Sequence, residues 1–509
     1  MGILGSLVKT AIEVNQKISF QNDNPINEQK DQLKELLNKA KDIAFGKYYG
    51  FEKILDSKDI IKEFQKTVPL HNYKQMSFWW DQQQQFPDIS WPGLPNYFAL
   101  TSGTTGNSSK RIPITNELSD SMRKVGVSLT SSLPNFDIPE EVFESSVLML
   151  SSSADLKKGK HGHLEGEISG INVHNLPNWY ELFYKPGKEI ASIDNWDQRL
   201  EAIVKEAPNW DIGAIAGIPS WVLLMLQEIV KQHKIKHIQD IWPNFRIYAS
   251  GGVAFETYRE DFEKISNKPL IIIDTYLASE GFFAYTEQSN TLDMRLALSH
   301  GYFYEFIPFD ERGVDEYGQI LDNPEIHTLD QVVENQVYVL IISSCVGAWR
   351  YMIGDTIQFT SVEPHQIKIT GRTKFFLNVV GSQLSEEKMD EAIIATAKTL
   401  GGTINEYMVA AMKNSDGEYI HQWVLVSRDE LDAHQASKKL DELLQEKNKN
   451  YKVARSKALK GIDVKIISKE KYNDYLSETK KKGGQVKTPK VMKEEKMKGL
   501  LDFLGLKPA

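Results

Sequence analysis

The stretch Leu100–Thr115 combines residue types that suit a polyphosphate ligand. It reads L-T-S-G-T-T-G-N-S-S-K-R-I-P-I-T, so glycines among hydroxyl residues are followed by the cations Lys110 and Arg111. Glycine allows the backbone to approach a ligand closely. Backbone N–H groups and hydroxyls can then hold phosphate oxygens while cations balance the charge. The candidate ligand-binding residues are therefore Thr101, Ser102, Gly103, Thr104, Thr105, Gly106 and Lys110.

This stretch taken alone has a second interpretation. A Walker A loop needs glycine, lysine and serine or threonine in direct succession, whereas Lys110 follows Gly106 by four residues. Glycine, serine, threonine and asparagine are also the residues of ordinary surface turns. A phosphate-binding loop and a surface turn both stay open until the rest of the chain is considered.

The composition bounds the class of protein. The chain has 509 residues, which is enough for two or more domains, or for one large and one small domain. Hydrophobic residues make up 41% and charged residues 25%, as in an ordinary soluble globular protein. The net charge of −9 argues against a nucleic-acid partner, although a small anion can still bind in a local basic pocket.

Several features favour a cytoplasmic protein with no membrane partner. The chain has a single cysteine, Cys345, which predicts a reducing compartment and a buried structural thiol. We expect no signal peptide, because no basic region is followed by an apolar core and a small-residue cleavage site. We also expect no membrane span, because no apolar run is long enough. The start, M-G-I-L-G-S, fits a myristoylation pattern, but the spacing of Leu7, Ala11, Val14 and Ile18 favours an amphipathic helix.

Helical and strand patterns alternate in the first part of the chain and predict an α/β sheet. Expected helices are Glu117–Leu133, Trp196–Glu206 and Ser220–Gln232, the last with Ser220 as N-cap, and expected strands are Ser145–Ser151, Phe245–Ser250 and Leu270–Tyr276. Ligands of such sheets gather beyond the carboxyl ends of the strands. Gly251, Gly252 and Ala278–Glu280 follow two of these strands and are therefore candidate site residues.

The pattern becomes β-rich from Gly301 and changes again after the middle of the chain. Expected strands are Phe303–Pro308, Val337–Ser343 and Thr356–Thr360, the last two joined through V-G-A-W-R-Y-M-I-G-D. A helix at Ser385–Thr399 then opens a unit of helices and strands, with strands at Tyr407–Met412, Gln422–Val426 and Val464–Ile467 and a helix at Glu430–Asn448. The predicted domains are 1–378 and 379–509. The basic stretch Lys480–Lys498 is interpreted as a solvated, mobile surface.

A possible metal site lies at His161, His163 and Glu165. These residues alternate, so a strand would place them on one face. No further histidine or cysteine is near enough in sequence to complete a site, and the surrounding glycines indicate a loop. The pattern therefore does not favour a metal here.

Four separated segments match one family pattern in order. They are T-S-G-T-T-G-N-S-S-K-R at 101–111, T-Y-L-A-S-E-G-F-F at 275–283, W-R-Y-M-I-G-D-T-I-Q-F-T at 349–360 and I-T-G-R-T-K-F-F-L-N at 369–378; G-G-Q-V-K-T-P-K at 483–490 adds to them. With these segments the chain resembles the adenylate-forming superfamily. It is most similar to the Gretchen Hagen family of acyl acid–amido synthetases, often labelled auxin-responsive promoter proteins, and to its bacterial-type members.

The resemblance implies a ligase that uses ATP and Mg²⁺. A carboxylic acid attacks the α-phosphate of ATP to give an acyl-adenylate and pyrophosphate, and an amine, usually an amino acid, then forms an amide. The implied fold is a large N-terminal α/β domain with a β-rich subdomain and a small mobile C-terminal α+β domain. The loop at 101–111 would hold the β- and γ-phosphates.

The resemblance also assigns roles to residues outside that loop. Gly251 and Gly252 would contribute to the ATP site. Glu280 would ligate Mg²⁺, which prefers oxygen ligands, and Asp355 would accept hydrogen bonds from the ribose hydroxyls. The other implied residues are Tyr276, Ala278 and Ser279 at the adenine and α-phosphate, Arg372 at ribose or phosphate, and Lys487, which would stabilise charge on the α-phosphate.

The sequence departs from the family pattern at two places. The family tail ends Lys-x-Pro-Arg, but here it is Lys487-Thr488-Pro489-Lys490, so the second cation lacks the forked geometry of arginine. Bacterial-type members tend to have Gly-Glu-Glu-Leu after the hinge, where this chain has G-S-Q-L at 381–384. Candidate walls of the acyl pocket are Leu156–Glu167, Gly217–Trp221 and Gly251–Phe255, with His161, His163 and Arg246 as possible carboxylate contacts.

Two alternative functions stay open at this point. An acyl-CoA synthetase would share the adenylation step but use a thiol acceptor, and a catalytically silent homologue would keep the fold for ligand binding. The acid, the amine and the oligomeric state do not follow from the sequence, and a monomer is favoured.

Overall fold

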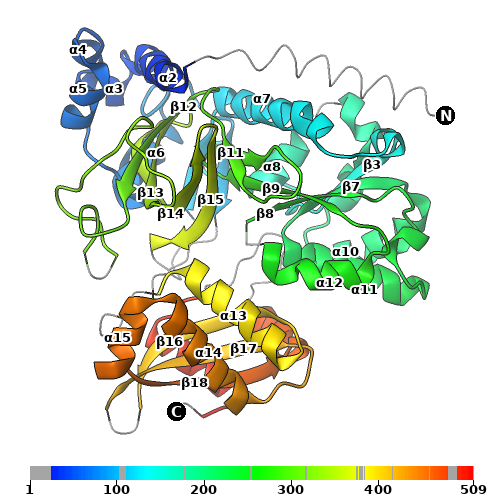
Figure 1. The fold of residues 1–509 in the computed structure, drawn as a ribbon. Helices are drawn as coiled ribbons and strands as arrows, with labels where there is room; N and C mark the ends of the chain where they lie inside the picture. The colour runs from blue at the N-terminus through cyan, green and yellow to red at the C-terminus, as the bar shows by residue number, and fades with distance from the viewer. Residues whose placement is uncertain are drawn as a thin grey trace.

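A computed structural model describes most of the chain (Figure 1). The described residues are 24–101, 110–176, 178–252, 255–315, 318–373, 377, 382, 384–414, 417–457, 459–479 and 490–507. The predicted N-terminal amphipathic helix, most of the predicted domain boundary, Lys487 and the loop residues Ser102, Gly103, Thr104, Thr105 and Gly106 lie outside the described residues. Within the described part no helix is long and apolar enough to cross a membrane.

From residue 24 on, where the described part begins, five helices precede the first strand and pack on the β-rich part of the chain. They are α2 (Pro25–Ala40), α3 (Ala44–Tyr49), α4 (Phe51–Leu55), α5 (Ile60–Thr67) and α6 (Tyr73–Gln83). Asn24 caps α2 through its side chain. The buried Gln29 amide of α2 donates to the carbonyl of Tyr302 at 3.0 Å, which ties this helix to the sheet beneath it.

The largest sheet of the described residues has eleven strands, and its strand pairing changes from parallel to antiparallel across the sheet. Its order is β12-β13-β14-β15-β11-β10-β9-β8-β7-β3-β6. The strands from β6 to β9 pair in parallel, whereas those from β9 to β12 pair antiparallel. The bounds are β3 (Ser146–Met149), β6 (Tyr184–Lys185), β7 (Ile212–Gly217), β8 (Ile247–Gly251), β9 (Ile271–Ala278), β10 (Gly281–Thr286), β11 (Met294–Leu296), β12 (Tyr302–Pro308), β13 (Val337–Ser344), β14 (Ala348–Val362) and β15 (His365–Arg372).

Helices cover the parallel half of this sheet, as burial of both faces requires. Helices α10 (Trp196–Glu206), α11 (Pro219–His233) and α12 (Arg259–Ile265) lie together on one face (Figure 1). Helices α7 (Asn116–Ser132), α8 (Ile168–His174) and α9 (Lys188–Ala191) complete this part, together with the 3₁₀ turns Leu133–Asn135, Glu140–Glu144, Asn178–Leu182, Ala207–Asn209, Ile238–Asp240 and Phe255–Tyr258.

A four-stranded sheet carries both ends of the candidate phosphate loop, Thr101 and Lys110. Its order is β2-β1-β5-β4, with β1 (Tyr97–Thr101), β2 (Lys110–Ile114), β4 (Lys157–Lys158) and β5 (Leu164–Gly166). Strands β1 and β2 are antiparallel, with Thr101 opposite Lys110. Both ends of the candidate phosphate loop are therefore fixed in one sheet.

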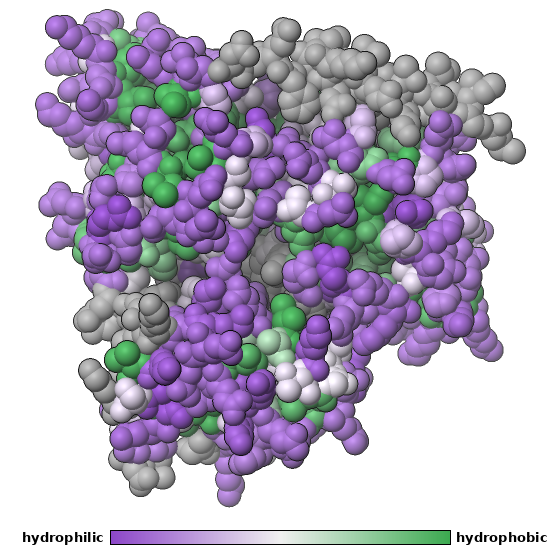
Figure 2. All heavy atoms as spheres, in the orientation of Figure 1, coloured by the Kyte–Doolittle hydropathy of each residue, from purple (hydrophilic) through white to green (hydrophobic). Residues whose placement is uncertain are grey.

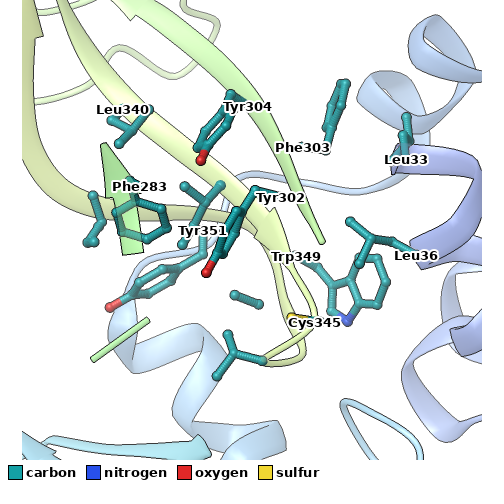
Figure 3. Close-up of a cluster of buried hydrophobic side chains, with 14 of the residues drawn as sticks. Leu33, Leu36, Phe283, Tyr302, Phe303, Tyr304, Leu340, Cys345, Trp349 and Tyr351 are labelled. Carbon is teal, nitrogen blue, oxygen red and sulfur yellow. The ribbon is translucent and has the colours of Figure 1, made fainter. Parts of the chain in front are cut away.

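The main core lies between the N-terminal helices and the antiparallel half of the large sheet (Figure 3). Leu33 and Leu36 of α2 face Phe303 of β12 and Trp349 of β14. Cys345 belongs to this core and is 3% exposed, and its burial raises the pKa of the thiol to about 12. The interpretation of Cys345 as a buried structural residue is confirmed.

The C-terminal part has its own sheet, order β16-β17-β18, and its own apolar clusters (Figure 1). Its elements are α13 (Glu386–Leu400), β16 (Ile404–Lys413), β17 (Tyr419–Ser427), α14 (Ala433–Lys447), α15 (Lys449–Lys457), β18 (Leu459–Ser468), α16 (Lys469–Glu478) and α17 (Glu494–Phe503). The predicted mixed α/β fold with a C-terminal α+β unit is confirmed. The surface is mostly hydrophilic in the view of Figure 2.

Three local predictions are wrong. The W-R-Y-M-I-G-D segment is part of the long strand β14, because it pairs with β13. Ser220 does not cap α11, since Pro219 is already inside the helix and Ile218 is the N-cap. The basic stretch Lys480–Lys498 is not all solvated surface, because in its described part, from Lys490 on, Met497 is buried and the Lys490 side chain is only 12% exposed.

Candidate active site

Asp355 lies where two neighbouring strands and a third, more distant strand bring their polar side chains together. The antiparallel pairing of β14 with β15 sets Asp355 opposite Arg372, and Arg372 Nε donates to Asp355 Oδ1 at 2.7 Å. Tyr276 of β9 donates its hydroxyl to Asp355 Oδ2 at 2.6 Å. Asp355 is 6% exposed, while the Arg372 side chain is 39% exposed. An ionised carboxylate offers about four acceptor positions, so these two donors leave room for a ligand's hydroxyls.

Glu280 occupies the tight turn between β9 and β10, directly after Ala278 and Ser279. Its carboxyl group is buried, and burial raises its pKa, with the charge of Asp355 adding to the effect. Lys110 and Arg372 oppose this rise. The structure thus brings Glu280, Asp355, Arg372 and Lys110 into one electrostatic neighbourhood, although three stretches far apart in sequence supply them.

Tyr73 and Tyr351 belong to the same neighbourhood and were missed by the sequence analysis. The Tyr73 hydroxyl, on α6, accepts a hydrogen bond from the Arg111 backbone N–H at 2.8 Å, and Lys110 Nζ lies 5.0 Å from the centre of the Tyr73 ring. Burial raises the pKa of Tyr351 well above its ordinary value, and the nearby Glu280 adds to this rise. The only available signal was that Tyr351 lies four residues before Asp355 in the same strand.

The candidate metal residues form an ion pair with an arginine. His163 Nε2 lies 2.9 Å from Glu165 Oε1, and Arg111 Nε donates to the same oxygen at 3.0 Å. His161 is exposed and takes no part in this cluster. Across the described ranges, no group of three histidine, cysteine or carboxylate residues is arranged to hold a metal ion. Glu165 therefore fixes Arg111 at the end of the candidate phosphate loop.

Gly251 and Gly252 lie at the carboxyl end of β8, as expected. A Cβ atom on Gly251 would meet Thr275 Oγ1 at 2.8 Å, and Gly252 has a φ of +87° that side chains rarely adopt. Asp274, beside this point on β9, was not predicted as a site residue. Burial raises its pKa to about 7.

Arg246 does not join the site. It precedes β8, so it lies at the opposite end of the strand from Gly251, about 16 Å away at the usual rise per residue. Its Nε donates to the Pro269 carbonyl at 3.0 Å. Arg246 is therefore a strand-end contact, and the interpretation as a carboxylate ligand is not supported.

Three family models match the chain in order and cover most of its length. They are described as the GH3 family N-terminal domain at residues 14–204, the GH3 family central domain at 295–372 and the GH3 family C-terminal domain at 387–496. Asp355 and Arg372 fall within the central match, whereas Glu280 lies between two matches.

Curated relatives are plant enzymes of low identity. The indole-3-acetic acid-amido synthetase GH3.2 of Arabidopsis thaliana is 25% identical over 38% of this chain and 38% of its own length. The putative indole-3-acetic acid-amido synthetase GH3.9 of the same plant is 24% identical over 56% of this chain and 49% of its own length. The aligned stretch is thus less than half of either relative.

Solved structures share the fold over nearly the whole chain. The acyl acid amido synthetase AtGH3.15 in complex with 2,4-DB has a TM-score of 0.76 at 15% identity, covering 94% of this chain and 93% of that one. A 2-hydroxyisobutyryl-CoA ligase in complex with its acyl-adenylate, 2-HIB-AMP, has a TM-score of 0.56 at 12% identity, covering 94% and 91%. The chain therefore shares its fold with these two ligases.

Proposed function

The chain belongs to the GH3 family, and from this premise we propose that it is an AMP-forming acyl acid–amido synthetase. The observation that carries the proposal is the position of Asp355, which accepts hydrogen bonds from Tyr276 and Arg372 beside Glu280 and Lys110. Both the fold and this cluster support an ATP-dependent ligase. The acid and the amine are small molecules, and we propose an amino acid as the amine.

In the first step a carboxylate oxygen forms a bond to the α-phosphorus of ATP, and the bond to the leaving pyrophosphate breaks. Asp355 would accept hydrogen bonds from ribose hydroxyls through the acceptor positions that Tyr276 and Arg372 leave unused. Lys110 would balance the charge of the phosphates at the end of the loop that runs from Thr101, with Ser102, Gly103, Thr104, Thr105 and Gly106 supplying backbone and hydroxyl donors. Arg372, which is partly exposed, is available for a phosphate oxygen.

Glu280 fits a Mg²⁺ ion, which usually takes one or two protein carboxylates and completes its shell with phosphate oxygens and water. A bound Mg²⁺ would supply charge stabilisation at the phosphates. Glu280 is buried and its pKa is raised, so its negative charge calls for a nearby cation. Lys110 partly provides this charge, and a metal ion would complete it.

In the second step the amine nitrogen attacks the activated carbonyl and loses a proton to water, an amide bond forms, and AMP leaves with the bonding electrons. We assign residues 1–378 to the adenylation domain and 379–509 to a small lid domain. Lys487 of the lid would stabilise charge on the α-phosphate during the first step. Ala278 and Ser279 would line the adenine and α-phosphate region at the end of β9.

A screen for pyrophosphate release over carboxylic acids tests this function. We expect release that depends on one class of acid, followed by an amide product when the best acid is supplied with amino acids. Mass spectrometry of the products distinguishes an amide from a CoA thioester. A thioester as the only product would assign the chain to the acyl-CoA ligases, and no acid-dependent release with any acid would contradict the enzyme function.

A further inference from the structure

Lys490 has an environment unlike that of a surface cation. Its Nζ donates to Asp390 Oδ1 at 2.7 Å and Oδ2 at 2.8 Å, and it lies 3.1 Å from Glu386 Oε1. It also lies 5.2 Å from the centre of the Tyr407 ring, whose hydroxyl donates to Asp390 at 2.7 Å. Only 12% of the Lys490 side chain is exposed. One ammonium group therefore pairs with two carboxylates and covers one aromatic face.

The backbone around Lys490 is fixed as well. The Val409 N–H of β16 donates to the Lys490 carbonyl at 2.7 Å, and the Met492 N–H donates to the Val409 carbonyl at 2.8 Å. Val491 thereby pairs with Val409 as a parallel β-bridge. Residues 490–492 are thus an added edge of the C-terminal sheet, held by main-chain and side-chain contacts together.

Both carboxylate partners belong to α13, which begins directly after the predicted domain boundary. Glu386 and Asp390 are one turn apart on this helix, and a Cβ on Gly371 of β15 would come within 2.7 Å of Glu386 Cβ. The start of α13 therefore contacts both the end of β15, which carries Arg372, and the segment that follows Lys487. Lys490 lies where these two chain segments meet.

We propose that Lys490 is a positioning residue. It anchors the segment 490–492 to the start of α13 and thereby limits the positions that Lys487, three residues earlier, can take relative to the α-phosphate. This inference rests on the proposed function, in which Lys487 acts on the α-phosphate. The second cation of the family tail therefore has a structural role in this chain. The charge of Lys490 is neutralised by Glu386 and Asp390 of α13 and is not free to contact a ligand.

The cluster of Lys490, Glu386 and Asp390 is linked through Glu406 to the large domain. Glu406 on β16 accepts a hydrogen bond from Tyr258, which lies just before α12 of the large domain. The charge of Lys490 acts on Glu406 and lowers the pKa that burial raises. The position of the tail is thus linked to the contact between the two domains.

The first test needs no substrate. A spin label on Lys487→Cys reports the mobility of the tail, and Cys345 should not react because it is buried. We expect Lys490→Met to increase the mobility of the label clearly, and Lys490→Arg to keep it near the parent value, since arginine retains the charge. Lys498→Met is the matched control, because Lys498 pairs with Glu494 at the surface. Equal mobility in the parent and in Lys490→Met would overturn the proposal, even if the enzyme function holds.

The second test separates positioning from simple loss of stability. Lys490→Met should slow acid-dependent pyrophosphate release about ten- to a hundredfold, since small displacements of catalytic groups have effects of this size. Amide formation from supplied acyl-adenylate should change less than about twofold on the same reasoning. In the Lys487→Met background the second substitution should add nothing to the loss of pyrophosphate release.

Asp390→Asn keeps Lys490 and should show a smaller loss of the same kind, which covers the case in which Lys490→Met does not fold. Equal losses in both half-reactions, or full additivity with Lys487→Met, would show a merely structural role. If no acid supports pyrophosphate release, the spin-label test still decides whether Lys490 anchors the tail.

Discussion

Strand β14 carries two arginine–carboxylate pairs whose environments differ. Arg350 donates to Glu305 through Nε at 3.0 Å and Nη2 at 2.9 Å, and both side chains are at most 3% exposed. Five residues later, Asp355 pairs with Arg372, whose side chain is 39% exposed. In the buried pair, Arg350 Nη1 also donates to the carbonyls of Gln65 and Val68 and so fixes α5 to the sheet. The first pair supports the fold, and the second keeps unused acceptors on Asp355 beside a partly exposed arginine.

The difference shows that an ion pair alone does not mark a functional site. A fully paired and buried charge contributes to one rigid arrangement, and removing its partner leaves an uncompensated charge. A pair with an exposed member can exchange partners with a ligand. Substitutions in the two pairs should therefore affect different properties.

The largest effect is expected for Glu305→Gln. It leaves the Arg350 charge buried without its partner, so the free energy of unfolding should fall by about 3–5 kcal/mol. Urea unfolding measures this change. Asp120→Asn, in the exposed pair with Arg123, is the control and should cost less than about 1 kcal/mol. A loss for Glu305→Gln as small as that of the control would remove the distinction between the two kinds of pair.

Asp355→Asn should act on turnover. The amide keeps the shape but loses the charge, and we expect kcat/KM for ATP to fall about a hundredfold, or about 2.7 kcal/mol. The free energy of unfolding should change by less than about 1 kcal/mol, because Arg372 remains in contact with water. Pyrophosphate release measures the change in kcat/KM, and urea unfolding of the same preparation measures the change in the free energy of unfolding. A large loss of stability with normal turnover would make Asp355 equivalent to Glu305.

His421 extends the comparison to a buried side chain that carries no charge. It is fully buried in β17, and burial lowers its pKa from 6.5 to about 3. The charge of Asp441 opposes this shift, whereas that of Arg455, which pairs with Asp441, adds to it. Below pH 6.5 the unfolded chain binds a proton that the folded chain does not, so stability falls as the pH decreases toward 3. At pH 5 the loss should be about 2 kcal/mol.

Urea unfolding of His421→Phe measures this contribution. The difference between parent and variant should change by that amount between pH 7 and pH 5. A difference that does not depend on pH would show that His421 titrates normally in the folded state.

Tyr276→Phe should have the smallest effect. It removes one donor to Asp355 but leaves Arg372 in place, so we expect about a tenfold loss in kcat/KM for ATP, or about 1.4 kcal/mol. Combining it with Asp355→Asn should give less than the sum of the two losses, because the residues are in contact. Additive losses would indicate that Tyr276 acts on the ligand independently of Asp355.

Much of the architecture follows from sequence patterns. The strand before Gly251 and the strand before Glu280 were predicted from their apolar, β-branched runs, and the helix capped by Ser385 was predicted from its first turn. The failure at W-R-Y-M-I-G-D has a physical cause. Its polar and glycine residues suggested a connection, but Gly354 takes a φ of +95° and Arg350 a φ of +44° inside a strand that β13 stabilises by pairing.

The sequence by itself determined the family, the order of the elements and the residue types of the site, because short-range spacing and local composition carry that information. Only the tertiary structure decided that Tyr73 contacts Lys110, that Asp274 lies beside Gly251, and that Lys490 pairs with Asp390 of α13. These contacts join residues that are dozens to a hundred positions apart. Their partners are fixed by strand register and by the packing of helices on sheets, which no local pattern specifies.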